Sequence, residues 1–163
     1  LNRKGIIMGG RVESRLIQLG IELPSPAAPA ANYVPFVMSG NRIFVSGQIP
    51  VLDGEIKYRG RLGEELVLDD GYQAARLCCL NIIAQAGAAC SGDLDRVQKI
   101  VKLGGFVSCN SDFTDQPKVI NGASDLMVEV FGHDVGQHAR FAVGTLSLPL
   151  GVAVEVDAVI EIN

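Results

Sequence analysis

The chain has 163 residues, of which 48% are hydrophobic and 20% charged, and its formal net charge is −4. This length suits a single domain with a sizeable core, and the composition is that of an ordinary soluble globular protein. The acidic balance gives no reason to expect a nucleic-acid-binding surface. No apolar run approaches the ~20 residues of a membrane-spanning helix, and no signal peptide is recognisable. We therefore expect a cytoplasmic protein without a membrane or nucleic-acid partner.

The first 31 residues predict an extension to this domain. Residues 12–19 carry apolar side chains at helical spacing before Gly20, which favours a short amphipathic helix. Residues 23–31 are rich in Pro and Ala and predict an extended connector that is too short to separate domains. We therefore divide the chain into an N-terminal extension, residues 1–31, and one domain, residues 32–163.

Two segments dominate the first half of that domain. Residues 34–46 predict a β-hairpin around Ser39-Gly40-Asn41. Residues 72–89 are Ala-rich, lack Pro and keep a helical apolar period, which predicts a long helix that covers one face of a sheet. Either Asp69 or Asp70 suits the N-cap of that helix.

A strand and a second helix are predicted next. Residues 97–108 are rich in β-forming residues, and the pair Gly104-Gly105 within them indicates a bulge or a close approach of the backbone. Residues 116–130 carry an apolar helical stripe, which Gly122 weakens locally. With helices on one side of a mixed sheet, the predicted fold class is α+β.

The last segment, residues 138–163, predicts a closing β-hairpin around Pro149-Leu150-Gly151. Arg140 opens its first strand and Glu155 lies in its second strand, so we expect the two side chains to meet across the hairpin. Such a pair is typical of a surface ion pair. It also suits an Arg fork that binds a ligand carboxylate, with an acidic side chain nearby to handle a proton or a water.

Candidates for metal or nucleophilic chemistry are few. The cysteines form no Cys-x-x-Cys motif and are expected to be reduced, buried thiols. His133 and His138 have no spaced Cys or carboxylate cluster beside them, so we expect no metal site. A Ser-His-Asp triad remains open, although no nucleophile-elbow sequence supports one.

Two sequence blocks carry a resemblance to a known family. One is Ala139-Arg140-Phe-Ala-Val … Leu-Pro149 … Val-Glu155-Val-Asp-Ala, and the other is Gly40-Asn41-Arg-Ile-Phe-Val-Ser46-Gly47-Gln48-Ile-Pro50. Together they resemble the Rid (reactive intermediate deaminase) family, also called YjgF-type or endoribonuclease L-PSP proteins. The first thirty residues are similar to those of a longer bacterial branch. The resemblance implies a YjgF-like, chorismate-mutase-like fold with two helices packed on one face of a mixed sheet. It also implies a barrel-like homotrimer with ligand clefts between subunits.

The resemblance assigns two catalytic residues. Arg140 stands where the family's Arg grips a substrate carboxylate, and a planar fork suits a carboxylate better than a Lys would. Glu155 matches the acidic residue that positions or activates the hydrolytic water.

Five further positions are implied to bind the substrate. Tyr33 matches an aromatic residue of the cleft, and Ser46 and Gly47 match a hairpin end that faces the ligand. Asn121 matches an Asn at a helix start. Ala142 stands where the family often has a Cys, so its backbone N–H remains and a thiol role is lost.

The implied reaction is hydrolysis of an enamine or imine, derived from a 2-amino acid, to a 2-keto acid and ammonia. It requires no cofactor, and its ligand is a small carboxylate-bearing molecule. Two other interpretations stay open: a non-catalytic, small-carboxylate-binding or regulatory trimer, and an endoribonuclease. The acidic balance and the lack of a basic-aromatic pattern argue against the endoribonuclease.

Overall fold

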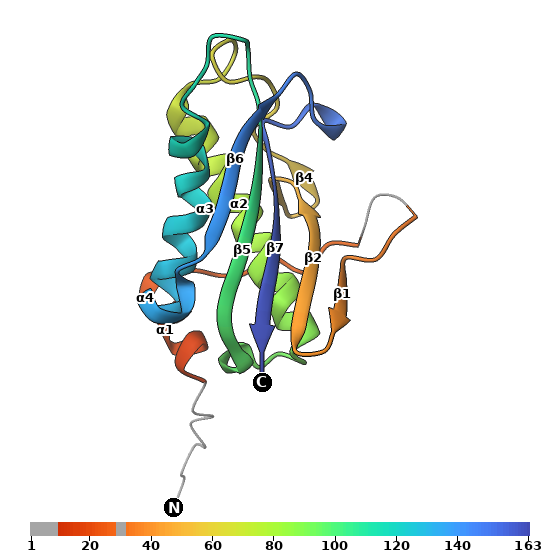
Figure 1. Ribbon diagram of the computed structural model, residues 1–163, viewed down its shortest axis with the longest axis vertical. Coiled ribbons are helices and arrows are strands. Elements are labelled where there is room, and N and C mark those ends of the chain that lie inside the picture. Colours follow the sequence, from red (N-terminus) through yellow and green to blue (C-terminus); the bar gives the residue numbers. More distant parts are fainter. Residues whose placement is uncertain (1–9, 29–31) are drawn as a thin grey trace, which may run out of the picture.

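The computed structural model describes residues 10–28 and 32–163 and shows an α+β fold with two layers (Figure 1). The first nine residues of the predicted extension and residues 29–31 of its connector lie outside the described residues. The helices are α1 (Arg11–Leu19), α2 (Leu68–Ala89), α3 (Gln116–Phe131) and α4 (His133–Gly136), with 3₁₀ turns η1 (Leu94–Arg96) and η2 (Pro149–Gly151). The strands are β1 (Phe36–Ser39), β2 (Arg42–Gln48), β3 (Val51–Leu52), β4 (Glu55–Ile56), β5 (Val97–Ser108), β6 (Ala139–Thr145) and β7 (Val154–Ile162). The predicted fold class is confirmed.

One layer is a five-stranded mixed sheet in the order β1-β2-β7-β5-β6, and β3 and β4 form a small separate hairpin. The predicted first hairpin is confirmed, because β1 pairs antiparallel with β2. The predicted closing hairpin is wrong. Strand β5 lies between β6 and β7, parallel to β6 and antiparallel to β7. The helix α3 joins β5 to β6, and a strand–helix–strand connection makes parallel neighbours, a constraint that the turn signal alone does not contain.

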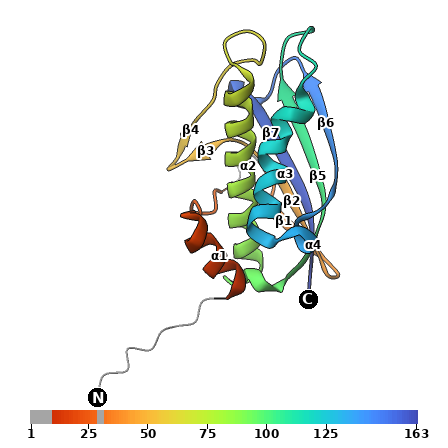
Figure 2. The ribbon, with the colours of Figure 1, turned by 90° about the vertical axis from the view of Figure 1, so that its left-hand side faces the viewer.

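The other layer consists of α2 and α3, which cover one face of the sheet (Figure 2). The continuous apolar face of β7 points into this core and is buried under the helices. Of the two predictions for Gly104-Gly105, a close approach to the backbone is confirmed. A methyl group at position 105 would lie 2.6 Å from the side chain of Ile120 on α3, and one at position 104 would collide with Asp157. Gly105 therefore lets α3 pack directly onto β5, and Gly104 makes room for the side chains of Asp157 and Phe141 from the two neighbouring strands.

The start of α2 differs from the prediction. The helix begins at Leu68, with Val67 as its N-cap, so that neither Asp69 nor Asp70 occupies that position. Asp70 instead accepts a hydrogen bond from the backbone N–H of Val67 at 2.9 Å. In a capping box, a carboxylate at the third helical position accepts from the N-cap backbone in this way. An acidic residue therefore does cap this helix, but from the third helical position and not from the N-cap.

The predicted N-terminal helix is confirmed as α1, which packs beside η1 and α3. Its apolar side chains Val12 and Leu16 are buried in the main core. Asp95 holds its N-terminus by accepting the backbone N–H groups of Arg11 at 2.7 Å and Val12 at 2.8 Å. Among the described residues, no helix is both long enough and apolar enough to cross a membrane.

Candidate functional site

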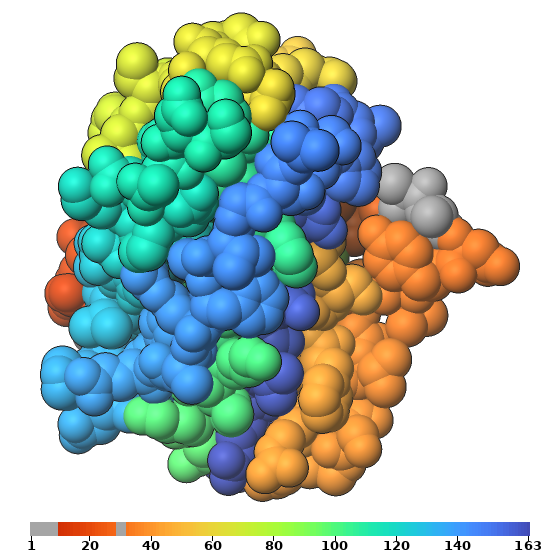
Figure 3. Space-filling model, turned by 45° about the horizontal axis from the view of Figure 1, so that its top comes forward, coloured from red at the N-terminus to blue at the C-terminus, as the bar shows by residue number. Residues whose placement is uncertain are grey.

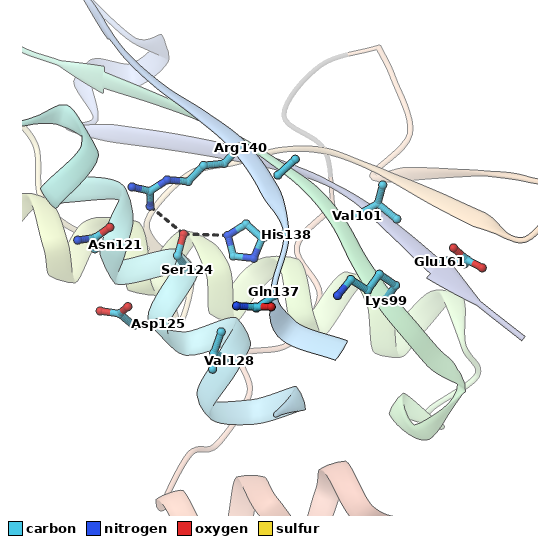
Figure 4. Close-up of a pocket in the computed structure, with 11 residues that line it drawn as sticks. Lys99, Val101, Asn121, Ser124, Asp125, Val128, Gln137, His138, Arg140 and Glu161 are labelled. Carbon is cyan, nitrogen blue, oxygen red and sulfur yellow. Dashed lines mark hydrogen bonds between the residues drawn. The ribbon is translucent and has the colours of Figure 1, made fainter. Parts of the chain in front are cut away.

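The side chain of Arg140 points from the start of β6 into a groove of about 790 Å³ beside α3 (Figure 4). Its Nη1 donates a hydrogen bond to Oγ of Ser124 at 2.8 Å, and its Nη2 donates one to the carbonyl of Pro117 at 3.0 Å. An Arg side chain carries five N–H donors, so these two bonds fix the guanidinium and leave further donors for an anionic ligand. Asn121 lines the same groove.

A short hydrogen-bonded chain continues from Arg140 through Ser124 to His138 (Figure 4). Oγ of Ser124 lies 2.9 Å from Nε2 of His138, and Nδ1 of His138 lies 2.7 Å from the carbonyl oxygen of Gly136. A carbonyl oxygen can only accept, so Nδ1 carries the proton and Nε2 of the neutral ring accepts from Ser124. Burial lowers the pKa of His138, and the nearby cations Arg140 and Lys99 add to this effect against the opposing bond to Gly136. The ring is therefore neutral at pH 7.

Glu155 lies in a second cleft, of about 520 Å³, between the first hairpin and the turn before β7. Tyr33 and Gly47 line this cleft with it, and the residue Tyr33 is about half exposed. A methyl group at position 47 would collide with the carboxylate of Glu155, so glycine is required for this approach. Burial first, and then the neighbouring Asp157 carboxylate, raise the pKa of Glu155. A raised pKa makes this carboxylate a stronger base than a fully exposed one.

The expectation that Arg140 and Glu155 meet across a hairpin is wrong. In the sheet, Arg140 is paired with Leu103 and Glu155 with Phe106, both on the intervening strand β5. The cavities of the two residues share no lining residue. Within one chain the predicted catalytic residues thus lie in two separate cavities.

The remaining predicted positions divide as follows. Ser46 does not line the Glu155 cleft, and its hydroxyl donates to the carbonyl of Val34 at 2.7 Å. This hydrogen bond connects β2 to the segment that contains Tyr33. The methyl group of Ala142 packs against the core from β6, so the side chain itself is structural.

Sequence reasoning did not find Ser124 or Lys99, and it considered His138 as a metal ligand and as a possible member of a Ser-His-Asp triad without naming its serine. The available signal was spacing, because His138 and Arg140 are two residues apart in a strand-like run, and Ser124 lies three residues after Asn121 on the same helix. Among residues 10–28 and 32–163, no cluster of three or more His, Cys, Asp or Glu side chains is placed to hold a metal ion.

The sheet face away from the helices exposes large apolar side chains. Val37, Phe44, Phe106 and Val143 come from four strands, and each is at least 40% exposed. Cross-strand pairing places Val37 beside Phe44 and Phe106 beside Val143. Figure 3 shows β6, β5, β7 and β2 following one another across this surface. The outward face of β7, which includes Glu155 and Asp157, lies between these two apolar pairs.

The fold and these sequence blocks define the class of protein. The family described as "YjgF/chorismate_mutase-like, putative endoribonuclease" matches residues 13–162, and the chain belongs to this family. The match includes most of α1. The expected YjgF-type family is therefore confirmed.

The chain is similar to one named relative and to several solved structures. Protein TCP17 of Trypanosoma cruzi is 51% identical over 158 residues, which cover 97% of this chain and 98% of that protein. The structure of Atu1372 from Agrobacterium tumefaciens, a protein of unknown function, superposes with a TM-score of 0.86 at 47% identity, covering 93% of this chain and 92% of that one. Escherichia coli TdcF, solved with bound serine, superposes with a TM-score of 0.59 at 26% identity, covering 86% of this chain and 98% of that one.

Proposed function

We propose that the protein is a deaminase that hydrolyses enamines or imines derived from 2-amino acids to 2-keto acids and ammonia. The observation that carries this proposal is the pair of cavities that hold Arg140 and Glu155, which we treat as two half-sites of one cleft. One presents the fixed guanidinium of Arg140, and the other presents Glu155 beside Gly47 and Tyr33. The exposed apolar sheet face supports a homotrimer in which the Arg140 half-site of one subunit faces the Glu155 half-site of its neighbour.

The ligand class follows from the chemistry of the guanidinium. Its free N–H groups form a planar fork that matches a carboxylate with two parallel hydrogen bonds. The relative TdcF was solved with serine, an amino acid and therefore a carboxylate-bearing molecule. An imine of a 2-amino acid has the same carboxylate next to an electrophilic C=N carbon.

Glu155 supplies the base for hydrolysis. The carboxylate takes a proton from a water as the water oxygen bonds to the C=N carbon. The nitrogen gains this proton as the C=N bond becomes single, which gives a carbinolamine. Glu155 then takes the remaining hydroxyl proton and passes it to nitrogen as the C–N bond breaks and the C=O bond forms, so that imine plus water gives keto acid plus ammonia. An imine is intrinsically labile in water, so positioning and proton transfer provide sufficient acceleration. The scheme uses side chains and water alone.

A second candidate is a binding or regulatory trimer that uses the same pocket without catalysis. Ala142 favours it, because the family often has a Cys at this position and this chain retains only the backbone N–H. An endoribonuclease is disfavoured, since Asp125 and Glu161 accompany Lys99 and Arg140 in the groove and the net charge is −4.

The test is a coupled assay in which a dehydratase releases 2-aminoacrylate or 2-aminocrotonate and keto-acid formation is followed. Arg140→Ala removes a charge-assisted fork from a partly desolvated carboxylate, a loss on the order of 2–5 kcal/mol, or tens to thousands of fold in kcat/KM. Arg140→Lys should recover part of this loss, because it keeps the charge without the fork. Alanine at the exposed Arg42 serves as the control.

Glu155→Gln separates the two candidates. In a deaminase this variant still binds a stable 2-keto acid but loses turnover. If the wild-type protein binds the keto acid and does not accelerate imine hydrolysis, the chain is a binding protein. If Arg140→Ala hydrolyses the imine at the wild-type rate, the assignment fails at its central residue.

A further inference from the structure

The hydroxyl of Ser124 is held between a base and a cation on the surface of α3. In the middle of a helix, a serine hydroxyl often bonds back to the carbonyl one turn earlier. The Ser124 hydroxyl instead points to the side chains of His138, at 2.9 Å, and Arg140, at 2.8 Å. From this arrangement we propose that Ser124 and His138 form a nucleophile–base pair, a second reactive centre that accepts acyl groups from small activated esters. The proposal is independent of the deaminase function.

The base in this pair, His138, is oriented by a backbone hydrogen bond. Nδ1 of His138 donates to the carbonyl of Gly136 at 2.7 Å, which fixes the ring and leaves Nε2 as the acceptor for the Ser124 proton. A nucleophile within hydrogen-bond reach of a base, with that base oriented by a third group, is the signature of nucleophilic catalysis. Here a backbone carbonyl takes the place of the usual carboxylate.

The cation supplies the stabilisation that such a reaction needs. Nη1 of Arg140 lies 2.8 Å from Oγ of Ser124, so an oxyanion that forms on a carbonyl bonded to Oγ lies within reach of the guanidinium. The half-buried Ser124 lines the groove of about 790 Å³, which gives room for a small ester. The structure thus places nucleophile, base and oxyanion stabiliser around one point.

The reaction balances with these groups. Oγ of Ser124 adds to the ester carbonyl as its proton passes to Nε2 of His138. The ester C–O bond then breaks, and the alcohol leaves with that proton. Water attacks the acyl-serine with His138 again as the base and releases the carboxylic acid, which restores Ser124. With a fluorophosphonate the Oγ–P bond forms, fluoride leaves, and the adduct is trapped for detection.

The charged groups near His138 come from four elements: Lys99 on β5, Asp125 on α3, Arg140 on β6 and Glu161 on β7. A merely structural pair, in which Ser124 and His138 only hold Arg140, makes no prediction of covalent labelling. Labelling therefore distinguishes a reactive centre from a positioning network.

The experiment treats the full chain with a fluorophosphonate at pH 5 to 8 and locates the adduct by intact-mass and peptide mass spectrometry. We expect one adduct per chain on Ser124, and its rate should rise as the pH passes the pKa of His138, which lies below the ordinary histidine value. Ser124→Ala should abolish the adduct. His138→Gln should slow it about 100-fold or more, because general-base assistance contributes a factor of this order.

His133→Gln is the matched control, since His133 is the other histidine, is largely exposed, and lies outside the groove. Melting curves of all variants serve to check that each is folded. The proposal is overturned if no adduct forms, if the adduct lies on another residue, or if its rate is unchanged in His138→Gln. The imine assay reports on the deaminase separately, so failure of one proposal does not imply failure of the other.

Discussion

Gly122 is where α3 comes closest to α2, and Gly122→Ala tests that packing. A methyl group at this position would collide with the carbonyl oxygen of Tyr72 and would lie 2.9 Å from its carbonyl carbon and 3.1 Å from the backbone nitrogen of Arg76. These are backbone atoms of a neighbouring helix, so no side-chain rotation can relieve the contact. The helices must separate locally.

The magnitude follows from two opposing effects. Overpacking a core costs about 1–3 kcal/mol, and contact with backbone places this site at the upper end. Alanine in place of a helical glycine stabilises the helix by about 1 kcal/mol. The net loss is therefore roughly 2 kcal/mol in the free energy of unfolding. For a chain of this length it corresponds to a fall in Tm of about 4–8 °C.

Gly87→Ala is the matched control on α2. The nearest atom to a methyl group there is Cδ2 of Leu94, at 3.9 Å, which is an ordinary contact. The helix-propensity effect then acts alone, and Tm should rise by about 2–4 °C. The assay is differential scanning calorimetry at one protein concentration. If Gly122→Ala is as stable as Gly87→Ala, the close packing of α2 on α3 described above is refuted.

Three further predictions concern α1 and the Glu155 cleft. Asp95→Ala removes the two hydrogen bonds that cap α1 and should lower the free energy of unfolding by about 1–2 kcal/mol in urea titrations, with an unchanged m-value. The pKa of Glu155 is raised in the folded state, so the folded state binds more protons and the charged form destabilises it above that pKa. Glu155→Gln should therefore raise Tm at pH 8, and this gain should shrink as the pH falls towards 5; a gain independent of pH would contradict the sign. Gly47→Ala should displace the Glu155 carboxylate and reduce imine hydrolysis without disturbing binding at Arg140, and full activity in this variant would show that the contact is dispensable.

Much of the fold could be predicted because each element carries its own periodicity. The helical apolar period of residues 72–89 and 116–130 marked α2 and α3 to within a few residues. The partner of β6 and β7 could not be predicted in this way, because both segments are strand-like and a turn-forming Pro-Leu-Gly lies between them, which favours a hairpin that does not form. Only the crossover through α3, which places β5 between them, decides the order.

The candidate site residues came from the resemblance, and their roles stay predictions. Arg140 and Asn121 line one cavity, and Glu155, Tyr33 and Gly47 line another. This division depends on the strand order and could not be derived from the predicted hairpin. The bond between Ser124 and His138 joins a helix to the segment before β6, a contact that no local spacing specifies.

The most direct test of the shared site uses subunits that carry complementary defects. Arg140→Ala and Glu155→Gln each lack one half-site and should be inactive alone in the imine assay. Co-expressed subunits that mix at random pair an intact Arg140 with an intact Glu155 in one cleft out of four, so about a quarter of the wild-type rate should return. If the mixture remains as inactive as its parents while the wild-type protein is active, the two half-sites do not form one cleft. If the wild-type protein gives no acceleration, the deaminase assignment itself is contradicted.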